Sequence, residues 1–180
     1  QMDFKPLRNK TIAILTNQSA VNRNNQHLLD ILTRYPDIKV KYLLSMEHGI
    51  WSTNDKRSKM VGRDGVSPLH KAQIIDLFKT YLNPPSWVMR DIDLVLVDYQ
   101  DTGSRYTTYT TTLSKVFESA SDFEIPVFLL DRPNPIRGDL ISGPLPRSDF
   151  QSFESYHLFP IRHGLTIGEM SLIINGMGWV

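Results

Sequence analysis

The sequence has no cysteine among its 180 residues, which excludes a disulfide framework and metal sites built from thiolates. It also has no apolar run near the roughly 20 residues that a membrane-spanning helix needs. Lysine and arginine number 20 and aspartate and glutamate 19, and the two signs are interspersed along the chain. This balance gives no indication of an electrostatic nucleic-acid binder.

Several motifs that serve particular chemistries are missing as well. There is no Gly-x-Gly-x-x-Gly turn, no phosphate-binding loop and no Gly-x-Ser-x-Gly elbow. Their absence argues against dinucleotide, nucleotide and serine-hydrolase functions, and we expect no cofactor. A chain of 180 residues with 41% apolar content can bury one sizeable core, so we expect a single domain over residues 1–180.

Short apolar runs alternate with stretches of helical spacing. The runs are typical of strands covered on both faces, and they are Thr11–Thr16, Val40–Met46, Leu94–Val97 and Val127–Leu130. Helical stripes lie over 28–32, 74–82 and 113–120. We expect Pro84-Pro85 to close the second helix, and a threonine-rich segment to supply hydroxyl caps to the third. The alternation predicts an α/β fold with a doubly wound, mainly parallel, Rossmann-like sheet and helices on both faces.

The pattern changes after Asp131. Residues 132–162 are rich in proline and have no sustained period, which predicts a long ordered loop, and loops of this length are usually functional. Residues 167–175 return to helical spacing, with Thr166 as N-cap and Glu169 as its capping-box partner. The apolar segment that follows is expected to contact a further domain or a second copy of the chain.

Polar side chains follow each predicted strand, where ligands bind in parallel sheets. They are Asn17, Gln18, Glu47, His48, Asp98, Gln100, Asp101, Asp131, Arg132 and Asn134. Any one of them is equally explained as a cap for the next helix. Because such residues follow all the predicted strands, we predict that they form one polar site.

Glu47-His48-Gly49 is the sharpest candidate for proton transfer, because burial and neighbouring carboxylates can poise a glutamate at a strand end. The alternative is a surface turn with Gly49 in a left-handed conformation. Asp98 and Asp101 are a candidate carboxylate pair, in which one holds Arg105 and the other faces a ligand. Internal ion pairs explain them equally well.

Other residues near these motifs are open to two interpretations. His163 either meets an anionic substrate group at a helix N-terminus or pins the long loop together with Arg162. Aromatic residues offer either sugar-stacking faces or structural anchors, and they are Trp51, Tyr106, Tyr109, Phe153 and Tyr156. A metal site would recruit Glu47, His48, Asp98 and His163, although their spacing fits no specific metal signature.

The motifs taken together resemble a known family. They are TNQSAV (16–21), EHG (47–49), DYQDTGSRY (98–106) with Tyr109, LDRPNPIRG (130–138), GPL (143–145), SF (152–153) and PIRHGLTIGE (160–169). Their order and approximate spacing resemble the NamZ-type exo-β-N-acetylmuramidases over nearly the whole chain. LDRPNP and RHGLTIGE are the most specific of these segments.

The resemblance implies a Rossmann-like catalytic domain, followed in full-length members by a smaller C-terminal domain that these residues lack. Such enzymes release N-acetylmuramic acid from the non-reducing ends of peptidoglycan fragments. The implied partner is therefore a peptidoglycan-derived glycan or muropeptide. From the composition and the missing motifs we expect no nucleic-acid partner, no membrane span, no metal and no cofactor. The implied location is secreted or periplasmic in a bacterium, with any leader already removed from this sequence.

The resemblance also implies roles for individual residues. Glu47 is implied as the catalytic carboxylate, with Asp98 or Asp101 as its partner. The residues implied to bind substrate are Asn17, Gln18, His48, Gln100, Arg105, Tyr109, Asp131, Arg132, Asn134, His163 and Glu169. Glycoside hydrolysis needs a protonated carboxyl at the leaving oxygen and a second group that meets an oxocarbenium-like centre.

The chain departs from the family pattern at two places. Residues 50–72 replace a glycine- and acid-rich loop and a Gly-Leu-Pro-Val-x-Ser-Leu-Tyr-like segment, and Thr107 stands where an aromatic residue is common. These departures keep an alternative open, in which the domain retains the fold and binds muropeptides or glycans without turnover.

Overall fold

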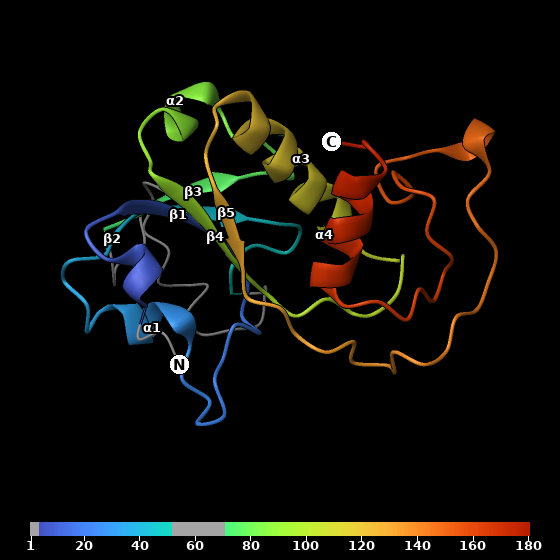
Figure 1. Ribbon diagram of the computed structural model, residues 1–180, viewed down its shortest axis with the longest axis horizontal. Coiled ribbons are helices and arrows are strands. Elements are labelled where there is room, and N and C mark those ends of the chain that lie inside the picture. Colours follow the sequence, from blue (N-terminus) through green and yellow to red (C-terminus); the bar gives the residue numbers. More distant parts are fainter. Residues whose placement is uncertain (1–3, 52–70) are drawn as a thin grey trace.

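The computed structural model describes residues 4–51 and 71–180, which fold around a five-stranded parallel sheet (Figure 1). The strands are β1 (Thr11–Thr16), β2 (Lys39–Ser45), β3 (Gln73–Asp76), β4 (Leu94–Asp98) and β5 (Val127–Leu129). Their order is β3-β2-β1-β4-β5, and every neighbouring pair is parallel. The predicted α/β fold class is confirmed.

Helices cover both faces of this sheet. They are α1 (Leu28–Leu32), α2 (Ser86–Met89), α3 (Tyr109–Asp122) and α4 (Ile167–Gly176), with short 3-10 turns η1 (Lys5–Leu7) and η3 (Ser148–Phe150). Successive residues of β1 point to opposite faces, so Ile12 and Ile14 join the core that contains α1. Ala13 and Leu15 join the other core, which contains α3 and α4.

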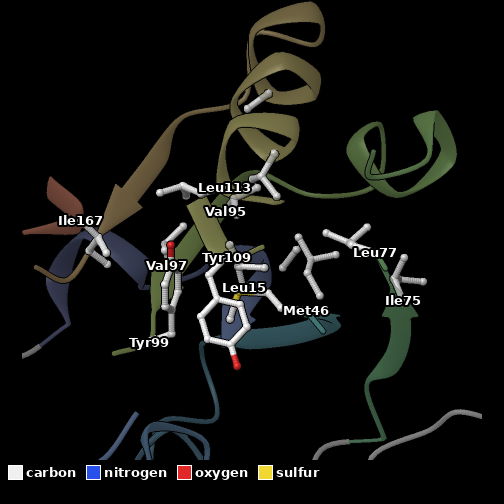
Figure 2. Close-up of a cluster of buried hydrophobic side chains, with 14 of the residues drawn as sticks. Leu15, Met46, Ile75, Leu77, Val95, Val97, Tyr99, Tyr109, Leu113 and Ile167 are labelled. Atoms are coloured by element: carbon white, nitrogen blue, oxygen red, sulfur yellow. The ribbon is translucent and has the colours of Figure 1, made fainter. Parts of the chain in front are cut away.

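The core between the sheet, α3 and α4 fixes the position of the strand ends. Figure 2 shows Leu15 and Val95 of the sheet near Leu113 of α3, with Ile167 of α4 at one side. Full burial of such a side chain contributes about 1.5–3 kcal/mol to folding, which is why the continuous apolar strands specify this two-faced packing.

One predicted helix is wrong. The stripe over 74–82 begins as strand β3, where Ile75 pairs with Leu44 of β2. Asp76 Oδ1 then accepts hydrogen bonds from the backbone amides of Phe78 and Lys79, both at 2.9 Å, and turns the chain. Pro85 does not close this helix either, since it is the N-cap residue from which α2 begins.

The order of the strands reverses direction at β1, because α1 and α3 cover opposite faces. A reversal of this kind opens a crevice at the carboxyl ends of the strands on either side of it. The predicted long loop over 132–162 is found, and the ladder between Ser142 and Arg162 holds its two limbs together. No helix in the two described stretches is long and apolar enough to cross a bilayer.

Candidate functional site

The carboxyl ends of β1 and β4 are tied together by side chains. Thr16 pairs with Asp98, so the two strands end level. Asn17 Oδ1 accepts hydrogen bonds from the Ser19 amide, at 3.0 Å, and from the Ser19 hydroxyl. The Ser19 Oγ in turn accepts from the Gln100 amide at 2.8 Å. The buried Asn17 side chain is therefore fixed in orientation, whereas its neighbour Gln18 is exposed.

Glu47 stands at the end of β2 in a tight turn. His48 and Gly49 both have left-handed backbone angles, with φ of 69° and 73°, so the turn proposed as the alternative is present. Glu47 Oε2 nevertheless accepts a hydrogen bond of 2.8 Å from the Thr108 hydroxyl. The Glu47 side chain is 28% exposed, and its Oε1 lies 3.9 Å from Nε2 of the open His48 ring. The carboxylate is thus anchored at one oxygen and accessible.

Thr108 is the N-cap residue of α3, yet its side chain makes no capping hydrogen bond. The expectation that hydroxyls cap this helix is wrong here, because the Thr108 hydroxyl donates to Glu47 instead. Sequence reasoning missed Thr108 and Ser19 as site residues, since a hydroxyl beside a helix start or a turn is more often a local cap.

Tyr109 places a hydroxyl beside Glu47. Its ring belongs to the core cluster, and Figure 2 shows the hydroxyl directed away from that cluster. Burial raises the pKa of Tyr109, and the charges of Glu47 and Asp101 raise it further, while a hydrogen bond with the Asn17 side chain opposes them. The hydroxyl therefore stays protonated and shares its surroundings with both carboxylates.

Asp98 forms an internal ion pair. Arg132 Nε donates to Asp98 Oδ1 at 2.7 Å, and the Asp98 side chain is almost fully buried. The same guanidinium donates to the Val21 carbonyl at 3.2 and 3.3 Å. The prediction that one of the two aspartates holds Arg105 is wrong, because Arg105 donates to the Pro144 carbonyl and the Ser155 hydroxyl.

Asp101 is buried in a second network. It accepts hydrogen bonds from the Gly103 amide at 2.9 Å and the Thr107 hydroxyl at 3.0 Å. His163 Nε2 lies 3.7 Å from Asp101 Oδ2, and His163 Nδ1 accepts from the Leu165 amide at 3.1 Å. These contacts favour the interpretation in which His163 pins the long loop.

The polar residues after β5 hold α4 and the start of the long loop. Asp131 accepts from the Gly168 amide at 2.9 Å and the Thr166 hydroxyl at 2.7 Å. Asn134 Nδ2 donates to the Leu165 carbonyl at 3.0 Å. The predicted capping box is confirmed, with Glu169 accepting from the Thr166 amide. Gln100 reaches this group through a 3.1 Å hydrogen bond from its side-chain amide to the Pro133 carbonyl.

The aromatic candidates divide between core and surface. Trp51 and Tyr109 are buried, Phe153 packs edge-on against Phe78, and Tyr156 lies under the Lys115 ammonium. Tyr106 is 75% exposed and presents an open ring. Within 4–51 and 71–180 no group of three or more acidic, histidine or cysteine side chains is arranged to hold a metal ion. Most of the divergent segment 50–72 lies outside the described residues.

The chain is similar to a known protein family. Residues 12–180 match the family model described as exo-β-N-acetylmuramidase NamZ, N-terminal. The chain is 32% identical over 174 residues to peptidoglycan β-N-acetylmuramidase NamZ of Bacillus subtilis (strain 168), an overlap of 95% of this chain and 41% of that protein.

Solved structures share the fold. One crystal structure of a DUF1343 family protein from Bacteroides fragilis NCTC 9343 has a TM-score of 0.85 and 30% identity over 98% of this chain and 44% of its own. A second from the same organism has a TM-score of 0.83 and 31% identity over 100% of this chain and 46% of its own. The chain spans less than half the length of each relative. With its family match over 12–180, it belongs to the exo-β-N-acetylmuramidase NamZ family of peptidoglycan glycosidases.

Proposed function

We propose that the protein containing this chain releases N-acetylmuramic acid from the non-reducing ends of peptidoglycan fragments. The observation that carries the proposal is the state of Glu47, which is anchored at Oε2 by Thr108 and 28% exposed at a strand end. In this proposal Glu47 gives its proton to the leaving glycosidic oxygen, a step that requires a carboxyl held within hydrogen-bond reach of substrate.

Groups around Glu47 support binding of an acidic sugar. The His48 ring is 64% exposed beside the carboxylate and is placed to meet the lactyl carboxylate of muramic acid. The Tyr109 hydroxyl, oriented through Asn17, is available to a sugar oxygen. The exposed Tyr106 ring offers a stacking face for a pyranose.

The second catalytic group stays a prediction, with Asp98 and Asp101 as the candidates. Asp98 is neutralised by Arg132, and Asp101 accepts two hydrogen bonds from its own turn. Both stay candidates, because Asp98 ends strand β4 and Asp101 follows it by three residues. In either case the carboxylate also holds its own part of the chain in place.

Hydrolysis of a chromogenic β-N-acetylmuramide by the full-length protein tests this function. Release is expected from the muramide and not from the matching β-N-acetylglucosaminide, and Glu47→Gln should abolish it. Glu124→Gln is the matched control, since Glu124 is an exposed glutamate just beyond the other end of α3. Full activity in Glu47→Gln, or equal release from both sugars, contradicts the proposal.

A second candidate is a muropeptide-binding domain without turnover. The burial of both Asp98 and Asp101 in internal contacts favours it, because a glycosidase needs a second group at the reacting centre. Calorimetric titration with a purified muropeptide separates the two candidates. Binding by a wild-type protein that releases no sugar supports the binding domain, and turnover rejects it.

We also propose that the protein acts outside the cytoplasmic membrane of a bacterium, where peptidoglycan lies. Cell fractionation followed by immunoblotting tests this location. Recovery in the periplasm or the medium supports it, and recovery confined to the cytoplasm contradicts it.

A further inference from the structure

Thr108 is the N-cap residue of α3, but its hydroxyl forms a hydrogen bond outside the helix. It precedes α3 with φ −81° and ψ 0°, and its hydroxyl makes no capping hydrogen bond. The hydroxyl donates instead across the crevice to Glu47 Oε2 at 2.8 Å. Thr108 is 2% exposed, so this hydrogen bond is shielded from water on the Thr108 side.

This contact makes the two oxygens of Glu47 inequivalent. Oε2 is an acceptor for Thr108 whether the carboxyl is ionised or protonated, since a hydroxyl can donate to either form. While Thr108 donates to Oε2, that oxygen acts as the carbonyl-type acceptor and Oε1 is the oxygen left to carry a proton. Oε1 is the oxygen that lies 3.9 Å from Nε2 of the exposed His48 ring.

We propose that Thr108 is the positioning residue of Glu47, fixing Oε2 so that Oε1 exchanges the proton with the glycosidic oxygen. The inference rests on the proposed function and adds a residue to it. A hydrogen bond to a charged group restrains the carboxylate within the narrow geometry that proton transfer requires. The other titratable groups that face Glu47 among the described residues are His48 and Tyr109, with Asp101 beyond Tyr109.

The chemistry of threonine provides clean variants. Thr108→Val keeps the volume and removes the hydroxyl, and no capping bond is lost with it. Thr108→Ser keeps the hydroxyl and removes a methyl group. Thr111→Val is the matched control one turn into the same helix, because the Thr111 hydroxyl donates to the Phe153 carbonyl rather than to Glu47.

The test measures kcat and KM for the chromogenic muramide with the full-length protein and each variant. Thr108→Val is expected to lower kcat about 10- to 100-fold with KM within about twofold, since the lost bond orients a reacting group. Thr108→Ser should keep kcat within about threefold of wild type, and Thr111→Val should do the same. Circular dichroism melts establish that the variants are folded.

Other results overturn the inference. Wild-type kcat in Thr108→Val, or a loss in Thr108→Ser or Thr111→Val as large as in Thr108→Val, removes the positioning role while the proposed function stands. An inactive wild-type protein rejects the proposed function and the positioning role together. If Thr108→Val does not fold, Thr108→Ala replaces it, because Ala and Ser at this position differ by one hydroxyl.

Discussion

Two histidine–carboxylate pairs in this structure have similar distances and opposite surroundings. His48 and Glu47 lie 3.9 Å apart with side chains 64% and 28% exposed. His163 and Asp101 lie 3.7 Å apart with side chains 3% and 5% exposed. The first pair has contact with water and room for a ligand, whereas the second is enclosed by the turn and loop that it joins.

The difference shows that residue type alone does not tell which of the two pairs is open to a ligand. In the enclosed pair Asp101 accepts hydrogen bonds from the Gly103 amide and the Thr107 hydroxyl, and His163 accepts one from the Leu165 amide. In the open pair Glu47 is held by one threonine at Oε2, and its Oε1 lies beside the exposed His48 ring. The same residue types therefore support different tasks.

Replacing the carboxylate of each pair by its amide should give the largest contrast. We expect Glu47→Gln to lower kcat about 10³-fold, because an amide cannot transfer the proton, and to leave the melting temperature nearly unchanged. Asp101→Asn should lower the free energy of unfolding by about 2–3 kcal/mol, because an amide nitrogen replaces a buried acceptor. Kinetics and urea unfolding of both variants provide the measurements. An equal loss of stability in the two variants would contradict the expected difference between the two pairs.

Removing the histidine of each pair tests the comparison through the free energy of unfolding. His163→Leu should cost about 2 kcal/mol, since the Leu165 amide loses its acceptor and the buried Asp101 loses its partner. His48→Asn should stay within about 0.5 kcal/mol, because the residue is exposed and asparagine tolerates the left-handed backbone. Urea unfolding of both variants measures these changes. A destabilised His48→Asn variant would show that the open pair also stabilises the fold.

A third histidine extends the comparison to pH. His157 is buried, contacts the Ser114 hydroxyl at 2.6 Å and stacks on Trp179. Burial lowers its pKa from 6.5 to about 4, with Glu118 raising it and Lys115 lowering it. Between pH 6.5 and pH 4 His157 is therefore protonated in the unfolded chain and neutral in the folded chain. The free energy of unfolding accordingly falls as the pH drops from 6.5 toward 4.

The expected loss is about 2 kcal/mol between pH 7 and pH 4.5, measured by urea unfolding of wild type. His157→Gln keeps a side-chain amide for Ser114 and removes the titration, so its stability should depend less on pH. An unchanged slope in the variant assigns the acid sensitivity to other groups.

A smaller effect concerns the start of α4. Thr166→Ala removes the cap that accepts from the Glu169 amide and the hydroxyl that donates to Asp131. We expect about 1 kcal/mol of destabilisation and unchanged kcat, because this contact secures architecture at the β5 end rather than Glu47. A change in kcat without a change in stability would place α4 in the reaction.

The sequence predicted the elements whose periodicity is unambiguous. The apolar runs of β1, β2, β4 and β5 and the capping box of α4 are found as expected. Strand β3 was missed, because Ile74, Ile75, Leu77 and Phe78 have the spacing of a helical stripe. A strand of 4 residues is too short for its own period to show.

The partners of the site residues could not be predicted, because they are distant in sequence. Asp98 meets Arg132 across 34 positions, and Glu47 meets Thr108 across 61. Strand-end polarity located the region, but it paired one of the two aspartates with Arg105 and assigned the threonine-rich segment before α3 to helix capping. Which polar group remains open to ligand depends on side-chain packing that no local pattern encodes.

At residue 49, in the turn after Glu47, the left-handed backbone conformation disfavours L-residues other than glycine, while the space around the residue does not restrict them. Gly49 has φ of 73°, yet a Cβ built there meets nothing within 4 Å. An L-alanine would carry about 1 kcal/mol of strain. D-alanine is relaxed at a positive φ and lowers the conformational entropy of the unfolded chain, so a semisynthetic protein with D-alanine at this position should be more stable by about 0.5 kcal/mol.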